Sequence, residues 1–174
     1  MNTNMPHIAK PSQIVIDFIK ATTAYGGDDY FKYSRFYNAK AAMDFEDWLE
    51  AQPAVEGIEL YRGYTFNEGY WNDCNVFEGR TLGADQLTQS LDLPAFTDQP
   101  LRAVRYMNDF GEIGLDNAVR VLFIIRTQGK YFVDISSLSI YPSEHEYRCK
   151  INTFLRVEKV ENKGAYIEVI CNEI

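Results

Sequence analysis

The order of the secondary-structure patterns is the feature that most constrains this fold: helical spacing comes first and strand alternation comes last. Apolar side chains recur every three or four residues between Pro11 and Thr22, which predicts a first helix, and one or two more helices are expected between Asp28 and Pro53. The last third alternates as strands do, with turns at Gly129 and at residues 162–164. The expected strands cover residues 119–127, 130–135, 144–151, 154–160 and 165–171. Helices followed by strands are typical of α+β folds with antiparallel sheets.

The length and the charge of the chain fit one domain without a nucleic-acid partner. Its 174 residues are enough to bury a hydrophobic core, so we expect a single domain, 1–174, with a helical part at 1–53 and a mainly β part at 54–174. The net charge of −8, from 17 basic and 25 acidic residues, would repel a phosphate backbone. No nucleic-acid partner is therefore expected.

The cysteines, the histidines and the N-terminus bear on location and on metal binding. Cys74, Cys149 and Cys171 are an odd number at spacings that match neither a zinc site nor a disulfide framework, which indicates reduced thiols. The 2 histidines, without an HExxH or CxxC motif, predict no metal site. Residues 1–10 lack the charged start and apolar run of a signal peptide, and no apolar stretch reaches membrane length. We expect a protein made in the cytoplasm, with no membrane partner, that a secretion route reading another signal could still export.

An arginine interrupts the apolar face of the first expected strand. Residues 58–64 alternate, which places Ile58, Leu60 and Arg62 on one face. A buried charge without a partner costs several kcal/mol. Arg62 therefore either pairs with a structural carboxylate or binds an anionic ligand, and the sequence leaves both readings open.

A helix is expected after Thr97 and Asp98, either of which can cap it, with Pro100 in its first turn. Its apolar side chains recur at helical spacing and are expected to face the core. They are Leu101, Ala103, Val104, Met107 and Phe110.

Two glutamates one residue apart, Glu144 and Glu146, follow a turn at Tyr141-Pro142. Side chains two residues apart on a strand share a face, so the two carboxylates are expected about 6 to 7 Å apart. If one cleft receives both, their pKa values separate, which suits one carboxylate for stabilising a cation and the other for handling a proton.

The same residues also fit an ordinary half-buried strand. In that reading one face is solvated and carries Glu146, Arg148 and Lys150. The inner face then carries Tyr147, Cys149 and Ile151.

Three segments in order resemble the mono-ADP-ribosyltransferases of the Arg-Ser-Glu, or ExE, class: Tyr61-Arg62-Gly63, Ala95-Phe96-Thr97, and Pro142-Ser143-Glu144-His145-Glu146. These are toxin-like enzymes that transfer ADP-ribose from NAD. The resemblance covers roughly the last two-thirds of the chain. It implies two packed, mostly antiparallel sheets around an NAD cleft, with NAD as a substrate and no metal ion. It also implies a protein substrate, whose identity the sequence leaves unknown.

The resemblance assigns roles to residues of the site. Glu146 corresponds to the catalytic carboxylate that holds a ribose hydroxyl and stabilises the cation, and Glu144 to the group that orients and helps to deprotonate the acceptor. In this family a glutamate at that position accompanies arginine as the acceptor. Arg62 would hold the NAD phosphates, and Gly63 would let the main chain approach the nicotinamide amide. Tyr141 would contact the protein substrate, whereas His145 is expected at the surface.

The middle motif departs from the family pattern. Ala95-Phe96-Thr97 lies where the family has Ser-Thr-Ser, and this segment is expected to contact NAD. The first serine of that motif supports the catalytic glutamate by a hydrogen bond, which Ala95 cannot form. Thr97, or Ser90 in a shifted alignment, is the expected substitute.

The resulting reading is an enzyme that ADP-ribosylates arginine on a target protein and acts as a toxin, an effector or a phage factor. Two alternatives remain open. One is an NAD glycohydrolase, in which water replaces the acceptor. The other is a catalytically inactive relative of the same fold that serves as a binding or inhibitory module.

Overall fold

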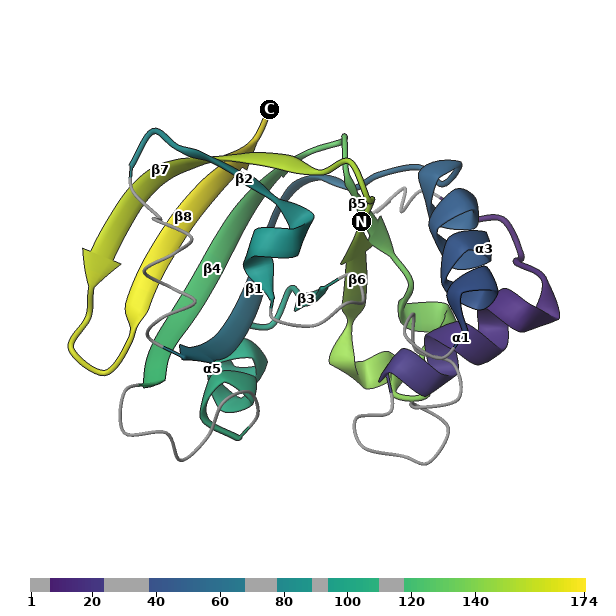
Figure 1. Cartoon of the computed structure of the whole chain (residues 1–174), viewed down its shortest axis with the longest axis horizontal. Coiled ribbons are helices and arrows are strands. Elements are labelled where there is room, and N and C mark those ends of the chain that lie inside the picture. Colours follow the sequence, from purple (N-terminus) through teal and green to yellow (C-terminus); the bar gives the residue numbers. More distant parts are fainter. Residues whose placement is uncertain (1–6, 24–37, 68–77, 89–93, 110–117) are drawn as a thin grey trace, which may run out of the picture.

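The computed structural model describes residues 7–23, 38–67, 78–88, 94–109 and 118–174. Within these residues helices precede most strands, as the sequence predicts (Figure 1). The α-helices are α1 (Gln13–Thr23), α3 (Ala39–Glu50) and α5 (Pro100–Asp109), and the 3₁₀ helices are η1 (Ala84–Leu87), η2 (Ser136–Leu138) and η3 (Pro142–Glu144). The strands are β1 (Glu56–Asn67), β2 (Thr81–Gly83), β3 (Ala95–Thr97), β4 (Ala118–Gln128), β5 (Phe132–Asp134), β6 (Glu146–Cys149), β7 (Phe154–Asn162) and β8 (Ile167–Glu173).

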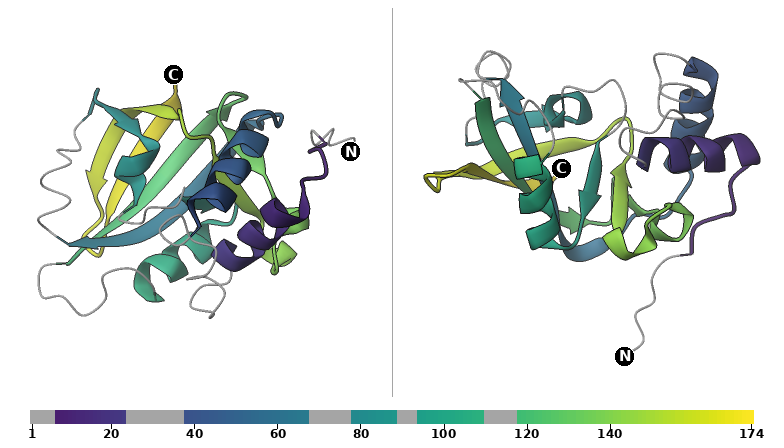
Figure 2. Two further views of the ribbon diagram at one scale, coloured as in Figure 1. Left: turned by 45° about the vertical axis from the view of Figure 1, so that its right-hand side comes forward. Right: turned by 90° about the horizontal axis from the view of Figure 1, so that it is seen from below.

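The first two described helices pack on each other at one end of the molecule (Figures 1 and 2). The N-terminus of α3 is capped by Asn38, whose side chain accepts a hydrogen bond from the Ala41 N–H at 3.1 Å. Apolar side chains at helical spacing, such as Phe18 of α1 and Phe45 of α3, form a core with Val133 and Ile135 from the β5 segment. None of the helices in the described part of the chain is long and apolar enough to cross a membrane.

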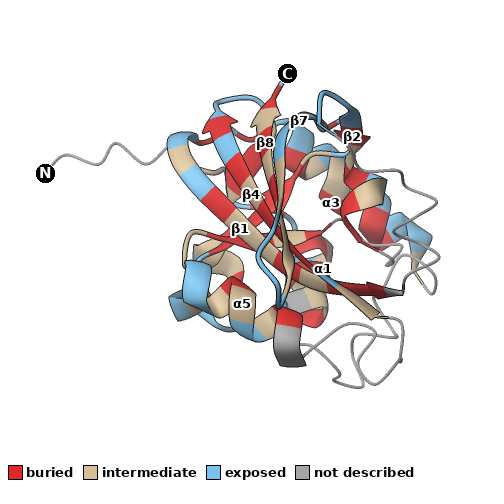
Figure 3. Cartoon of the chain, turned by 90° about the vertical axis from the view of Figure 1, so that its left-hand side faces the viewer, coloured by how far each residue is buried: buried red, intermediate tan, exposed pale blue. Residues whose placement is uncertain are grey.

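The strands of the described residues form one mixed sheet in the order β2-β7-β8-β4-β1-β3-β6-β5. The pair β4–β8 is parallel, and the other neighbours are antiparallel. Buried positions gather along β4 and β8 (Figure 3). The strand directions confirm the prediction of a mostly antiparallel sheet.

The expectation of two separate sheets is wrong, and the reason lies in β1. This long strand pairs with β4 from Glu56 to Asn67 and also pairs with β3, where Tyr61 lies opposite Thr97. The pairing of Tyr61 with Thr97 thus joins two parts of the sheet. One part consists of β2-β7-β8-β4-β1, and the other consists of the short strands β3-β6-β5. The two parts that were expected to be separate sheets share this one narrow junction.

Alternation along β1 separates two environments. Leu60 and Phe66 lie in the main hydrophobic core. Tyr61 points to the other face of the sheet, where it packs against a smaller cluster that contains Ala103 and Met107 of α5. Arg62 lies on the same face of β1 as Leu60, as the alternation predicts.

Helix α5 packs directly against Gly63 of β1. A Cβ atom placed on Gly63 would lie 1.9 Å from the Ala103 carbonyl oxygen and 2.7 Å from the Met107 Cβ, so only glycine permits this approach. Ala103 and Met107 are buried, as expected, but Leu101 is wrongly assigned to the core because it is 84% exposed. Phe110 lies outside the described residues.

Candidate active site

The two glutamates lie on either side of a tight turn and not on one strand, so the expectation of a shared strand face is wrong. Glu144 ends the 3₁₀ helix η3, and Glu146 begins β6. Between them His145 adopts a left-handed conformation, with φ of 50°. Asp98 holds this turn, because its carboxylate lies 2.9 Å from His145 Nδ1 and accepts a hydrogen bond from the Tyr147 hydroxyl at 3.2 Å. The His145 side chain is exposed, as expected.

Glu146 is buried beside Arg148, so the reading of a solvated strand face is also wrong. The two residues are 7% and 2% exposed, and Arg148 Nε donates to Glu146 Oε1 at 2.6 Å. Strand β6 is enclosed because β3 and β5 flank it and the helix pair covers this face. Ile151, expected inside, is exposed instead.

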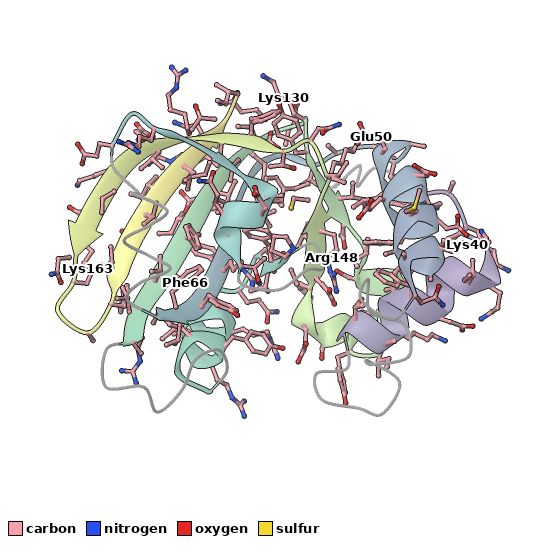
Figure 4. The ribbon with its side chains drawn as sticks, viewed as in Figure 1. Lys40, Glu50, Phe66, Lys130, Arg148 and Lys163 are labelled. Carbon is pink, nitrogen blue, oxygen red and sulfur yellow. The ribbon has the colours of Figure 1, made fainter. Side chains whose placement is uncertain are left out.

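Arg148 connects the glutamate to the helices at the N-terminal end of the chain. Its Nη2 donates to the Thr22 hydroxyl of α1 at 3.1 Å, and its guanidinium carbon lies 5.9 Å from the centre of the Phe45 ring of α3. Figure 4 shows Arg148 beside β6, between the sheet and the helix pair. Arg148 was not among the predicted site residues, although an opposite charge two residues from Glu146 was a usable signal.

Burial and the charge of Arg148 shift the pKa of Glu146 in opposite directions. Burial raises the pKa of Glu146 most strongly, and the positive charge and hydrogen bond of Arg148 lower it. The negative charge of Glu144 also raises the pKa of Glu146, by less than burial does. The net effect is that the pKa of Glu146 lies above the ordinary value for a glutamate.

Ser139, which lies outside the three motifs, places a hydroxyl group beside Glu146. Its side chain donates a hydrogen bond to Glu146, which lowers the pKa of that carboxyl, and accepts one from the Tyr141 N–H at 3.1 Å. The buried Thr97, the expected substitute, instead donates to the Glu144 carbonyl oxygen at 2.8 Å. Ser90, the other expected substitute, lies outside the described residues. Nothing in the three-segment pattern pointed to Ser139.

Helix α5 holds the carboxylate of Glu144. Arg102 Nη1 donates to Glu144 Oε1 at 3.2 Å, and the Tyr106 hydroxyl donates to Oε2 at 2.6 Å. Burial, together with this hydrogen bond to Glu144, raises the pKa of Tyr106, which keeps the hydroxyl a donor at neutral pH. Arg102 and Tyr106 are four residues apart and share one helix face, a spacing from which both could have been inferred.

Arg62 contacts β3, the strand that pairs with β6 and its Glu146. Its Nε donates to the Leu87 carbonyl at 2.8 Å and its Nη1 to the Ala95 carbonyl at 3.0 Å, while its guanidinium carbon lies 5.0 Å from the Tyr64 ring centre. These bonds fix the guanidinium beside β3. Its contact with phosphates stays a prediction.

The remaining predicted residues differ in their surroundings. Phe96 is a core residue whose ring meets Phe132 edge to face at 4.9 Å, and the position of Ala95 in β3 lies opposite Arg148. Tyr141 is exposed next to Ile140, at the start of η3. The contacts of Gly63, Ala95, Phe96 and Thr97 with NAD, and of Tyr141 with a protein substrate, stay predictions.

The two cysteines of the described residues, Cys149 and Cys171, are both buried. Burial raises the pKa of Cys149 and of Cys171 to about 12, so neither thiol is ionised at neutral pH. Among the described residues, His, Cys, Asp and Glu side chains form no group of three that could hold a metal ion.

No protein-family model and no curated protein matches the sequence. Solved structures do match. The ADP-ribosyltransferase Vis of Vibrio splendidus, in complex with an inhibitor, has a TM-score of 0.66 at 17% identity over 92% of this chain and 71% of its own chain. Vis has also been solved in complex with agmatine, with a TM-score of 0.62 at 18% identity over 93% of this chain and 67% of that one.

Two further bacterial proteins share the fold. Plx2a, an ADP-ribosyltransferase toxin from Paenibacillus larvae, has a TM-score of 0.55 at 13% identity, over 94% of this chain and 87% of its own. The type III effector XopAI from Xanthomonas axonopodis pv. citri has a TM-score of 0.61 at 14% identity, over 92% of this chain and 66% of its own. The chain therefore has the fold of the bacterial ADP-ribosyltransferase toxins and effectors.

Proposed function

We propose that this chain is an NAD-dependent enzyme that transfers ADP-ribose to an arginine side chain of a target protein. The observation that carries the proposal is the placement of two glutamates at one turn. Glu146 is buried and bonded to Arg148 and Ser139, whereas the carboxylate of Glu144 is partly exposed. Two carboxylates in different environments suit two different tasks.

Cleavage of NAD requires negative charge near the ribose. When the bond between ribose C1′ and the nicotinamide nitrogen breaks, nicotinamide leaves neutral with the electron pair, and positive charge develops on the ribose. A carboxylate fixed in a buried place stabilises that charge strongly because little solvent screens it. Glu146 fits this task, and Arg62, with its planar set of donors beside β3, fits the phosphates. This chemistry requires no metal ion.

Arginine is the acceptor that the surroundings of Glu144 favour. Glu144 already binds one guanidinium group, that of Arg102, at 3.2 Å. Agmatine, which Vis binds in its solved complex, also carries a guanidinium group. We therefore assign Glu144 to the orientation and deprotonation of an acceptor arginine.

The biological role that fits this activity is that of a toxin or effector acting on a protein of another cell. Vis and Plx2a are described as toxins and XopAI as a type III effector.

The activity is tested by incubating the chain with NAD and agmatine, with separate measurements of nicotinamide release and of ADP-ribosyl-agmatine. We expect both products from the native chain. Binding of NAD should stabilise the fold by about 2.7 kcal/mol at a hundredfold excess over the Kd. An inactive binding module would give neither product, and no nicotinamide release at millimolar NAD would refute the proposed enzyme.

An NAD glycohydrolase is the second candidate. It is favoured by the fact that Arg102 and Tyr106 engage both oxygens of Glu144, because water as acceptor need not displace either of them. Glu144→Gln separates the candidates. A transferase loses ADP-ribosyl-agmatine in this variant while part of its nicotinamide release persists, whereas a glycohydrolase forms no ADP-ribosyl-agmatine even as the native chain.

The acid limb of the pH profile should report the ionisation of Glu146. Because burial raises the pKa of Glu146, nicotinamide release should fall at a higher pH than for an ordinary glutamate. Ser139→Ala removes a hydrogen bond that lowers this pKa, so it should move the acid limb to still higher pH and slow the reaction roughly ten- to a hundredfold. The profile is measured as initial rate against pH. A Ser137→Ala variant, which changes a neighbouring serine of η2, serves as the control, and an unmoved acid limb in Ser139→Ala would contradict the role of Ser139.

A further inference from the structure

The carboxylate assigned to the acceptor arginine already carries an arginine of the same chain. Arg102 Nη1 lies 3.2 Å from Glu144 Oε1, and the guanidinium group is the functional group of the proposed acceptor. An incoming arginine that binds Glu144 Oε1 would therefore compete with Arg102 for that oxygen.

The contact between Arg102 and Glu144 is exchangeable because both side chains are partly exposed. The side chains of Arg102 and Glu144 are 31% and 25% exposed, so solvent reaches both. An ion pair of this exposure is weak, and an external guanidinium can compete for it. When Arg102 turns away from Glu144, its Nε can keep its bond to Gln99 Oε1, which is 2.8 Å long.

Glu144 is held in place independently of Arg102. Its Oε2 accepts from the Tyr106 hydroxyl at 2.6 Å, its carbonyl oxygen accepts from the Thr97 hydroxyl at 2.8 Å, and its N–H donates to the Tyr141 carbonyl at 2.9 Å. Loss of the Arg102 contact would therefore leave the carboxylate oriented and open on one oxygen.

We propose that Arg102 occupies the acceptor position on Glu144 as a resident competitor and thereby lowers the affinity of the site for free guanidinium compounds. The inference rests on the proposed function, because it is that function that assigns Glu144 to the acceptor. A target protein docked nearby presents its arginine at a high effective concentration and displaces Arg102, whereas a small molecule does so poorly. Arg102 is thus a residue that selects for docked protein substrates.

The test compares agmatine binding and turnover in the native chain and in Arg102→Gln. Isothermal titration calorimetry measures agmatine binding without NAD, and transfer kinetics with NAD give KM and kcat for agmatine. In Arg102→Gln the Kd and the KM should both fall about three- to tenfold, since the apparent affinity of a site rises when its competitor is removed, and kcat should change little. Arg102→Lys, which keeps the charge but not the planar fork, should lie between the two.

Two control variants separate competition from other effects. Arg105→Gln removes one positive charge from the exposed part of the same helix and should leave the Kd unchanged. Tyr106→Phe removes the other hydrogen bond to Glu144 and should lower kcat without tightening agmatine binding.

The outcomes distinguish this inference from the proposed function. If Arg102→Gln binds agmatine more weakly or equally well, or if its kcat falls with an unchanged KM, Arg102 merely positions Glu144 and the inference is wrong. If agmatine binding tightens in Arg102→Gln but neither chain releases nicotinamide from NAD, the competitor is correct and the proposed enzyme is wrong. If the native chain transfers ADP-ribose and the affinity does not rise, only the inference fails.

Discussion

Glu146→Gln should lower the rate of nicotinamide release from NAD by about 100- to 1000-fold, because one preorganised group that stabilises transition-state charge is worth this much. Glutamine keeps the size of the side chain and an oxygen that can accept from Arg148 Nε, now 2.6 Å from Glu146 Oε1. The change therefore removes the negative charge while largely preserving the packing. Circular dichroism and urea denaturation verify that the variant is folded.

A second buried glutamate provides the control for Glu146→Gln. Glu173 of β8 is 3% exposed and accepts hydrogen bonds from the N–H groups of Gln128 and Tyr131 at the Gly129 turn. Glu173→Gln should lower stability but leave the rate per folded molecule unchanged. Nicotinamide release that survives Glu146→Gln at the native rate would refute the proposed mechanism.

Arg148→Met should lower the free energy of unfolding by about 3–5 kcal/mol near neutral pH, since it leaves the carboxylate of Glu146 buried without its partner. The loss should depend on pH. Without Arg148 the folded-state pKa of Glu146 rises further above its unfolded value, because Arg148 is the main group that lowers it. Stability is then retained at low pH, where Glu146 is protonated, and is lost as the pH rises through the folded-state pKa.

Urea denaturation at pH 5 and at pH 8 measures this difference for the native chain and for Arg148→Met. The double variant Glu146→Gln/Arg148→Met removes both charges and should recover part of the stability. The matched control is Arg126→Met, whose ion pair with Glu158 is 49% and 48% exposed and should contribute at most about 1 kcal/mol. An equal loss in Arg126→Met and Arg148→Met would show that burial does not matter as argued.

The periodicity of the sequence predicted the elements but not their surroundings. The helix after Pro11 and the strands of the last third follow from the spacing of apolar residues, which local chemistry determines. The two faces of β6 could not be assigned in this way. Arg148 and Glu146 are buried because α1 and α3, more than ninety residues away in the chain, cover that face.

The sequence predicted some residues of the candidate site but missed others that contact Glu146, among them Arg148 and Ser139. Short motifs pointed to Arg62, Glu144 and Glu146, the residues to which the proposed function assigns NAD binding and cleavage. The left-handed conformation of His145 has no signature in the residue itself, so the separation of the two glutamates into η3 and β6 was missed. Ser139 was missed because its approach to Glu146 depends on the path of the chain between β5 and β6.

The hydrogen bond from Arg148 to Thr22 joins residues that are 126 positions apart. Contacts of such separation form only after the intervening chain has been ordered, and they slow folding. During synthesis α1 leaves the ribosome long before β6 exists. The environment of Glu146 is therefore completed only when nearly the entire chain has been made, so that nascent or truncated chains ending before β6 lack the carboxylate and its partner altogether.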